Sequence, residues 1–124
     1  MAECNCGCGQ KTNLIYACSG AANTGFLADQ VARGLMKDGT GSMTCLAAVG
    51  AELSGFVASA RGADSNIVID GCAVGCGAGI FERLGLPYTQ FVVTDYGVKK
   101  GKTEITGEVI EEVKNAIKGA LCNG

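Results

Sequence analysis

The stretch NIVID at residues 66–70 decides the fold class that this sequence predicts. Its run of three β-branched aliphatic side chains is typical of a strand that is buried on both faces of a sheet. Similar short apolar stretches occur as NLIYA at residues 13–17 and QFVVT at residues 90–94, and residues 43–48 are also predicted to form a strand. Strands buried on both faces indicate a parallel sheet with helices on either side.

Segments with helical periodicity alternate with these strands. Residues 23–38 carry apolar side chains at three- and four-residue spacing, and Gly39 suits the position after the helix end. Further helices are expected within residues 72–84 and over residues 106–121. The shorter helix after the second strand is expected to bury one face, formed by Leu53, Phe56, Val57 and Ala60. The alternation predicts an α/β fold: a single-domain three-layer sandwich with a mostly parallel four-stranded sheet, strand order 2-1-3-4, and helices on both faces.

Composition and charge limit the classes of function. The 124 residues are 48% hydrophobic and 18% charged, which is enough to build a core and argues against disorder. Residues 1–12 are expected to form a flexible Cys/Gly-rich tail, and residues 13–124 a single metal-binding domain. The net charge of −2 argues against nucleic-acid and membrane partners, which favour basic surfaces. No signal peptide or membrane span is recognised, so a cytoplasmic protein is expected, of undetermined oligomeric state.

Eight cysteines and the absence of histidine are the main functional signal. In a reducing compartment, clustered cysteines are more often metal ligands or redox groups than structural disulfides. Without histidine, Cys-His zinc fingers and histidine-based catalytic dyads are excluded. Cys4, Cys6 and Cys8 form a tail that wraps a soft metal, supplies a ligand to the main site or has no role. No role is predicted for Cys122.

Four cysteines are expected to meet at the carboxyl edge of the sheet, where open parallel sheets form their sites. Cys18 follows the first strand, Cys45 lies within the second predicted strand, and Cys72 follows the third. Cys76 comes four residues after Cys72, so the two would share a face in the first turn of a helix. Neighbouring strand ends lie about 4.8 Å apart, which suits thiolates around one metal ion. Soft ligands of this kind select zinc or, alternatively, an iron–sulfur cluster.

A second class of function remains open. A thiol oxidoreductase or redox sensor would use Cys72 with Cys76, or Cys18 with Cys72. A cysteine phosphatase is excluded, because no arginine lies six residues after a candidate nucleophile. The glycine motifs of nucleotide-binding proteins are missing, and so is the Cys-x-x-Cys motif of thioredoxin-like proteins.

Polar residues near the predicted site have simpler interpretations. Asp70 and Asp95 end strands and are expected to cap the turns that follow them. Ser19 and Asn23 are expected to cap the first helix. The short run of Lys99, Lys100 and Lys102 is predicted to be a solvated turn rather than a phosphate contact.

The chain also resembles the DGC-domain family of proposed zinc-binding proteins. The resemblance rests on YACSGAAN at residues 16–23, CLA at 45–47, DGCAVGC at 70–76 and VTDYG at 93–97, which occur in matching order. It implies four chelating cysteines at Cys18, Cys45, Cys72 and Cys76, and it implies no particular reaction.

Overall fold

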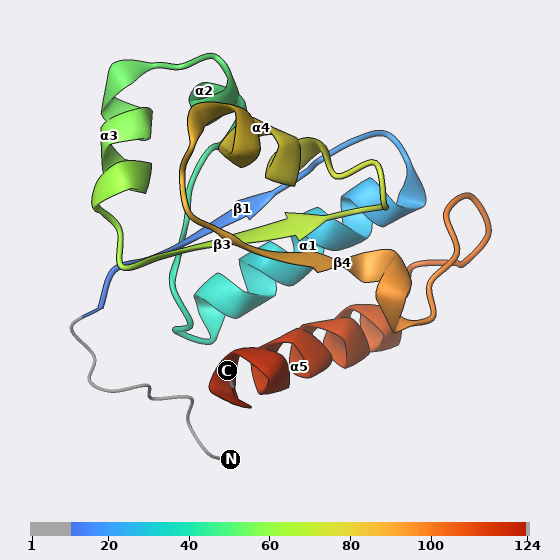
Figure 1. The fold of residues 1–124 in the computed structure, drawn as a ribbon. Coiled ribbons are helices and arrows are strands. Elements are labelled where there is room, and N and C mark those ends of the chain that lie inside the picture. Colours follow the sequence, from blue (N-terminus) through green and yellow to red (C-terminus); the bar gives the residue numbers. More distant parts are fainter. Residues whose placement is uncertain (1–10, 124) are drawn as a thin grey trace.

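Four parallel strands form the centre of the computed structural model, which describes residues 11–123 (Figure 1). The sheet has the order β2-β1-β3-β4, and every neighbouring pair of strands is parallel. The predicted α/β fold and the predicted strand order 2-1-3-4 are therefore confirmed. The strands are β1 (Asn13–Ala17), β2 (Ser42–Met43), β3 (Ser65–Asp70) and β4 (Thr89–Val92).

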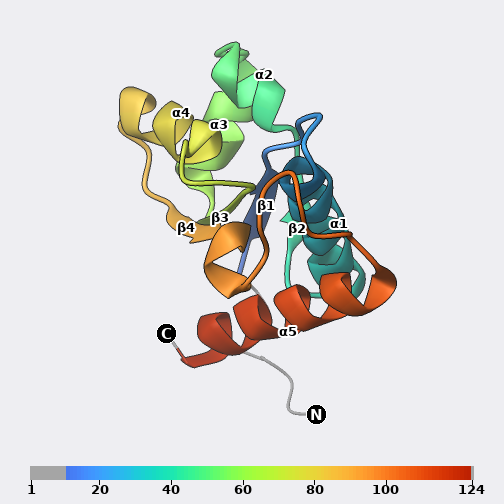
Figure 2. The same ribbon diagram turned by 90° about the vertical axis from the view of Figure 1, so that its right-hand side faces the viewer.

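Helices cover both faces of this sheet, as Figure 2 shows. One face carries the two long helices, α1 (Asn23–Lys37) and α5 (Gly107–Asn123). The other face carries three shorter helices, α2 (Leu46–Gly50), α3 (Ser54–Gly62) and α4 (Cys76–Leu84). A short 3₁₀ helix, η1 (Val93–Tyr96), follows β4.

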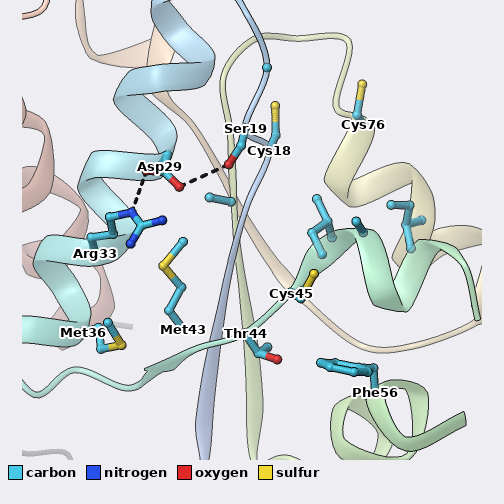
Figure 3. Close-up of a pocket in the computed structure, with 15 residues that line it drawn as sticks. Cys18, Ser19, Asp29, Arg33, Met36, Met43, Thr44, Cys45, Phe56 and Cys76 are labelled. Atoms are coloured by element: carbon cyan, nitrogen blue, oxygen red, sulfur yellow. Dashed lines mark hydrogen bonds and ion pairs between the residues drawn. The ribbon is translucent and has the colours of Figure 1, made fainter. Parts of the chain in front are cut away.

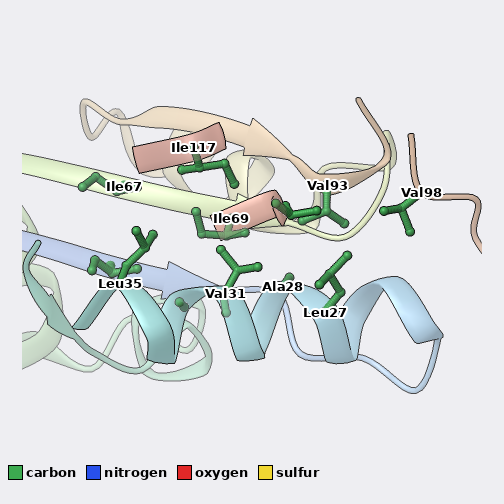
Figure 4. Close-up of a cluster of buried hydrophobic side chains, with 13 residues drawn as sticks. Leu27, Ala28, Val31, Leu35, Ile67, Ile69, Val93, Val98 and Ile117 are labelled. Carbon is green, nitrogen blue, oxygen red and sulfur yellow. The ribbon is translucent and has the colours of Figure 1, made fainter. Parts of the chain in front are cut away.

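The two cores follow from the alternation of side chains along the central strands. Ile67 and Ile69 of β3 point toward α1 and α5, whereas Val68 between them points toward α4. Figure 4 shows the larger core, in which these isoleucines pack on one apolar stripe of α1. That stripe has the three- and four-residue spacing of the sequence and consists of Leu27, Ala28, Val31, Ala32 and Leu35.

Tyr16 occupies the second core and makes the stability of the domain sensitive to high pH. Burial raises the pKa of its phenol from 10.0 to about 12, and the hydroxyl donates a 3.0 Å hydrogen bond to Asn66 Oδ1. The unfolded chain releases this proton at a lower pH than the folded chain. The stabilisation is therefore complete below pH 10 and is lost as the pH rises toward 12. We expect the free energy of unfolding in urea to fall by about 2 kcal/mol over this window.

The Tyr16→Phe variant is the control for this pH dependence. Phenylalanine has no ionisable hydroxyl group at this position, so the free energy of unfolding of this variant should fall less steeply between pH 10 and pH 12. Equal slopes for the two proteins would contradict the assignment to Tyr16.

The second predicted strand is wrong for most of its length. Residues 43–48 do not form one strand, because β2 ends at Met43 and α2 begins at Leu46. An apolar run of this length fits a strand and a buried helix equally well, and the segment LAA is rich in strong helix formers. The fourth strand also ends earlier than predicted, since residues 93–94 belong to η1.

The predicted buried face of the third helix is only partly correct. Ala60 is fully buried, but Leu53 and Phe56 are exposed on the surface. The predicted tail of residues 1–12 lies almost wholly outside the described residues. No helix within residues 11–123 is long and apolar enough to cross a membrane.

Candidate functional site

Cys18 lies at the carboxyl end of β1, where the backbone fixes it between two strands. Its N–H donates a 3.0 Å hydrogen bond to the carbonyl of Ile69 on β3. Its sulfur accepts a hydrogen bond from the N–H of Gly71, the residue that follows β3. The side chain is half-buried and lines a pocket at the edge of the sheet, while the backbone of β3 packs against the other side of the residue.

The electrostatic surroundings of Cys18 include two of the other predicted ligands. Burial raises the pKa of its thiol most, the Gly71 N–H lowers it, and the nearby Asp70, Cys76 and Cys72 raise it further. Cys72 and Cys76 therefore lie within electrostatic range of Cys18. The raised pKa, whose largest cause is burial, disfavours an isolated thiolate at Cys18.

Cys72 and Cys76 do not share a helical turn, contrary to the prediction. Cys72 lies in a turn closed by a 3.1 Å hydrogen bond from the Gly75 N–H to the Cys72 carbonyl. Gly75 has a φ of 66°, a left-handed conformation that favours glycine, and Cys76 is the first residue of α4. The chain therefore reverses between the two cysteines.

Asp70 holds the start of α4 against the sheet. Its fully buried carboxylate accepts hydrogen bonds from the N–H groups of Gly77 at 2.8 Å and Ala78 at 3.1 Å, and from Gln90 Nε2 at 2.9 Å. The interpretation of Asp70 as a cap is confirmed. Gly77 permits this close approach, because a Cβ there would lie 2.6 Å from Val68 Cγ1.

Three of the four predicted cysteines line one pocket of about 880 Å³ (Figure 3). The side chains of Cys18 and Cys76 point in the same direction, and Cys45 lies nearer to Phe56 in this view. Cys45 is exposed and immediately precedes α2, instead of lying inside a strand. Cys72 is outside this lining but within electrostatic range of Cys18.

The described side chains do not already form a closed ligand set. Within residues 11–123, no group of three or more cysteine, aspartate or glutamate side chains is placed so that it could hold a metal ion. The predicted tail cysteines, Cys4, Cys6 and Cys8, lie outside the described residues. Cys122 is not among the free cysteines. It lies near the end of α5, on the side of the molecule where the strands begin, and therefore far from the carboxyl ends of the strands (Figure 1).

Known proteins are similar in sequence to most of this chain. The family profile described as the DGC domain matches residues 14–117. The chain belongs to the DGC domain family. Among curated proteins, "Anaerobic and virulence modulator AnvM" of Pseudomonas aeruginosa is 33% identical over 88 residues, which cover 70% of this chain and 67% of that protein. No solved structure gives a significant match.

The loop at residues 99–103, which contains three lysines, lies beside Cys72 in this DGC domain. Lys100 Nζ lies 3.5 Å from Cys72 Sγ. Asn23 holds the loop, because its side-chain amide donates to the carbonyls of Lys99 and Thr103 and accepts from the Gly101 N–H at 2.7 Å. The lysine run is an exposed turn, as predicted, and within it Lys100 also contacts Cys72. Asn23 joins this loop to α1 instead of capping the helix.

The pocket wall opposite the cysteines consists of charged residues on α1. Asp29 Oδ2 pairs with Arg33 Nε at 2.7 Å, and the hydroxyl of Ser19 donates to Asp29 Oδ1 at 3.2 Å. Ser19 thus contacts the middle of α1, and the prediction that it caps this helix is wrong. No side chain caps the start of α1.

Proposed function

We propose that this DGC domain binds one zinc ion through cysteine thiolates at the carboxyl edge of the sheet, with Cys18, Cys72 and Cys76 as ligands and Cys45 as the fourth. The observation that supports the proposal most is the grouping of thiols around Cys18. Cys45 and Cys76 line the same pocket, and Cys72 and Cys76 contribute to the electrostatic field at Cys18.

The donor set fits a soft or borderline metal ion. Thiolates select zinc or iron–sulfur clusters over magnesium or calcium. The nearest buried carboxylate, Asp70, is already engaged by two backbone N–H groups and by Gln90. The Gly71 N–H that donates to the Cys18 sulfur is the type of contact that supports a metal-bound ligand.

Zinc binding requires a change in the positions of the thiols. With four protein thiolates a zinc ion has a structural role, whereas with three it keeps an open position that can bind a further ligand.

Metal analysis of anaerobically purified full-length protein tests this function. We expect about one zinc ion per chain and no visible absorption, because zinc lacks the coloured transitions of iron–sulfur clusters. Bound zinc should also protect Cys72 and Cys76 from iodoacetamide, and a chelator should expose both together. Metal-free protein in which Cys18, Cys45, Cys72 and Cys76 all titrate freely would contradict the proposal.

The contact between Lys100 and Cys72 favours a second candidate, a thiol-based redox sensor. A peroxide would oxidise Cys72 to a sulfenic acid and release water, and Cys18 or Cys76 would displace a second water to form a disulfide. The similar AnvM is named as an anaerobic modulator, which is compatible with a response to oxidants. This function predicts one rapidly alkylated cysteine whose rate of alkylation is unchanged by a chelator.

Either function requires free thiols, so we infer a reducing, cytoplasmic location.

A further inference from the structure

The pocket beside the cysteines has an apolar wall that the proposed metal site does not use. Met36 and Phe56 are among the large hydrophobic side chains that remain exposed, at 43% and 38%, and both line this pocket with Met43. They come from α1, α3 and β2, so three separate elements contribute apolar side chains to the lining of one pocket. A volume of about 880 Å³ is that of a typical small-molecule site.

Arg33 is oriented at the edge of this wall with most of its hydrogen-bonding capacity unused. Its Nε donates to Asp29 Oδ2 at 2.7 Å, and Ser19 donates to the other oxygen of the same carboxylate. The two terminal nitrogens of the guanidinium have no hydrogen-bond partner among residues 11–123. Figure 3 shows them directed away from α1, on the side where Met43 lies.

This combination selects a particular chemical class of ligand. A planar guanidinium fixed by its Nε presents paired donors that match the two oxygens of a carboxylate. Apolar side chains next to it favour a hydrocarbon chain. The Arg33 side chain is 59% exposed, so water supplies acceptors to its terminal nitrogens in the free protein. A neutral apolar ligand would make no use of these donors, and a small polar anion would leave Met36 and Phe56 uncovered.

We propose that this pocket binds an amphipathic organic carboxylate, with its carboxylate on the terminal nitrogens of Arg33 and its hydrocarbon chain against Met36, Met43 and Phe56. The carboxylate end of the ligand lies on the side of the pocket opposite Cys76 (Figure 3). Its binding does not require a metal ion, so this proposal and the proposed zinc site can fail independently.

Titration of the ¹⁵N-labelled full chain with octanoate, followed by NMR, tests the proposal. We expect saturable binding at a single site, with the largest shifts at Met43 and Phe56. Arg33→Gln should weaken octanoate binding by about fivefold, because it removes the charged donors of a partly exposed ion pair. Phe56→Ala should weaken it by several-fold, and octanol should bind more weakly than octanoate to the unmodified protein.

Arg61→Gln is the matched control, since Arg61 is also an exposed helical arginine but lines a different pocket. It should bind octanoate as the unmodified protein does, and the thermal unfolding of all variants should show that they fold. The proposal is wrong if octanoate does not bind saturably, or if Arg33→Gln and Arg61→Gln have equal effects. It is also wrong if sedimentation shows a dimer that Phe56→Ala dissociates while octanoate has no effect, because a second copy of the chain would then cover the apolar wall.

Discussion

Replacement of Cys18 by serine is expected to lower the affinity for zinc by about two orders of magnitude or more. The proposed site is centred on Cys18, because this residue lies between the ends of β1 and β3 and lines one pocket with Cys45 and Cys76. A serine hydroxyl stays protonated near neutral pH and is a far weaker zinc ligand than a thiolate. Competition with a chromophoric chelator measures the change directly.

Comparison among the cysteines then defines the ligand set. Cys72→Ser and Cys76→Ser should have effects as large as Cys18→Ser. Thr44→Ala changes another pocket-lining residue that carries no soft donor, and it should leave the affinity unchanged. If Cys45→Ser binds zinc as tightly as the unmodified protein, the site has three protein ligands. Unchanged affinity in Cys18→Ser would remove the basis for a site at this edge.

The fold could be predicted because its information is local. The β-branched run of β3 and the periodic stripe of α1 each specify an element within one short segment. Right-handed crossover connections then restrict the order of the strands. The segment at residues 43–48 could not be assigned in this way, because its apolar side chains have no period that separates a strand from a helix. For this reason Cys45 was predicted to lie inside a strand, whereas it is the residue that precedes α2.

The candidate site could be predicted only where it depends on strand ends. Cys18 and Cys72 follow β1 and β3, so their proximity follows from the sheet order. The approach of Lys100 to Cys72 depends on contacts of Asn23 with residues more than 70 positions away, and no local pattern encodes them. Ser19 and Asn23 are common helix caps in isolation, and only the tertiary structure shows that both bind elsewhere.

Asp70→Ala is expected to lower the free energy of unfolding by about 3 kcal/mol. The carboxylate is fully buried and accepts from the Gly77 and Ala78 N–H groups and from Gln90. Removing it leaves the N–H groups of Gly77 and Ala78 without an acceptor in a buried region, whereas the exposed Gln90 can bond to water. An unsatisfied buried donor costs about 1–3 kcal/mol. It also removes the cap of α4, since no other side chain caps that helix. The midpoint of thermal unfolding should fall by about 10 °C or more.

Asp95→Ala is the matched control for this loss, because Asp95 also follows a strand but is exposed in η1. It should change the free energy of unfolding by less than about 0.5 kcal/mol. Asp70→Asn should fall between the two, because one amide oxygen can still accept while the new NH₂ group faces a donor. Equal stabilities of Asp70→Ala and Asp95→Ala would show that the buried carboxylate does not hold α4. Since α4 begins at Cys76, a true loss of this cap should also weaken zinc binding in Asp70→Ala at temperatures where the variant remains folded.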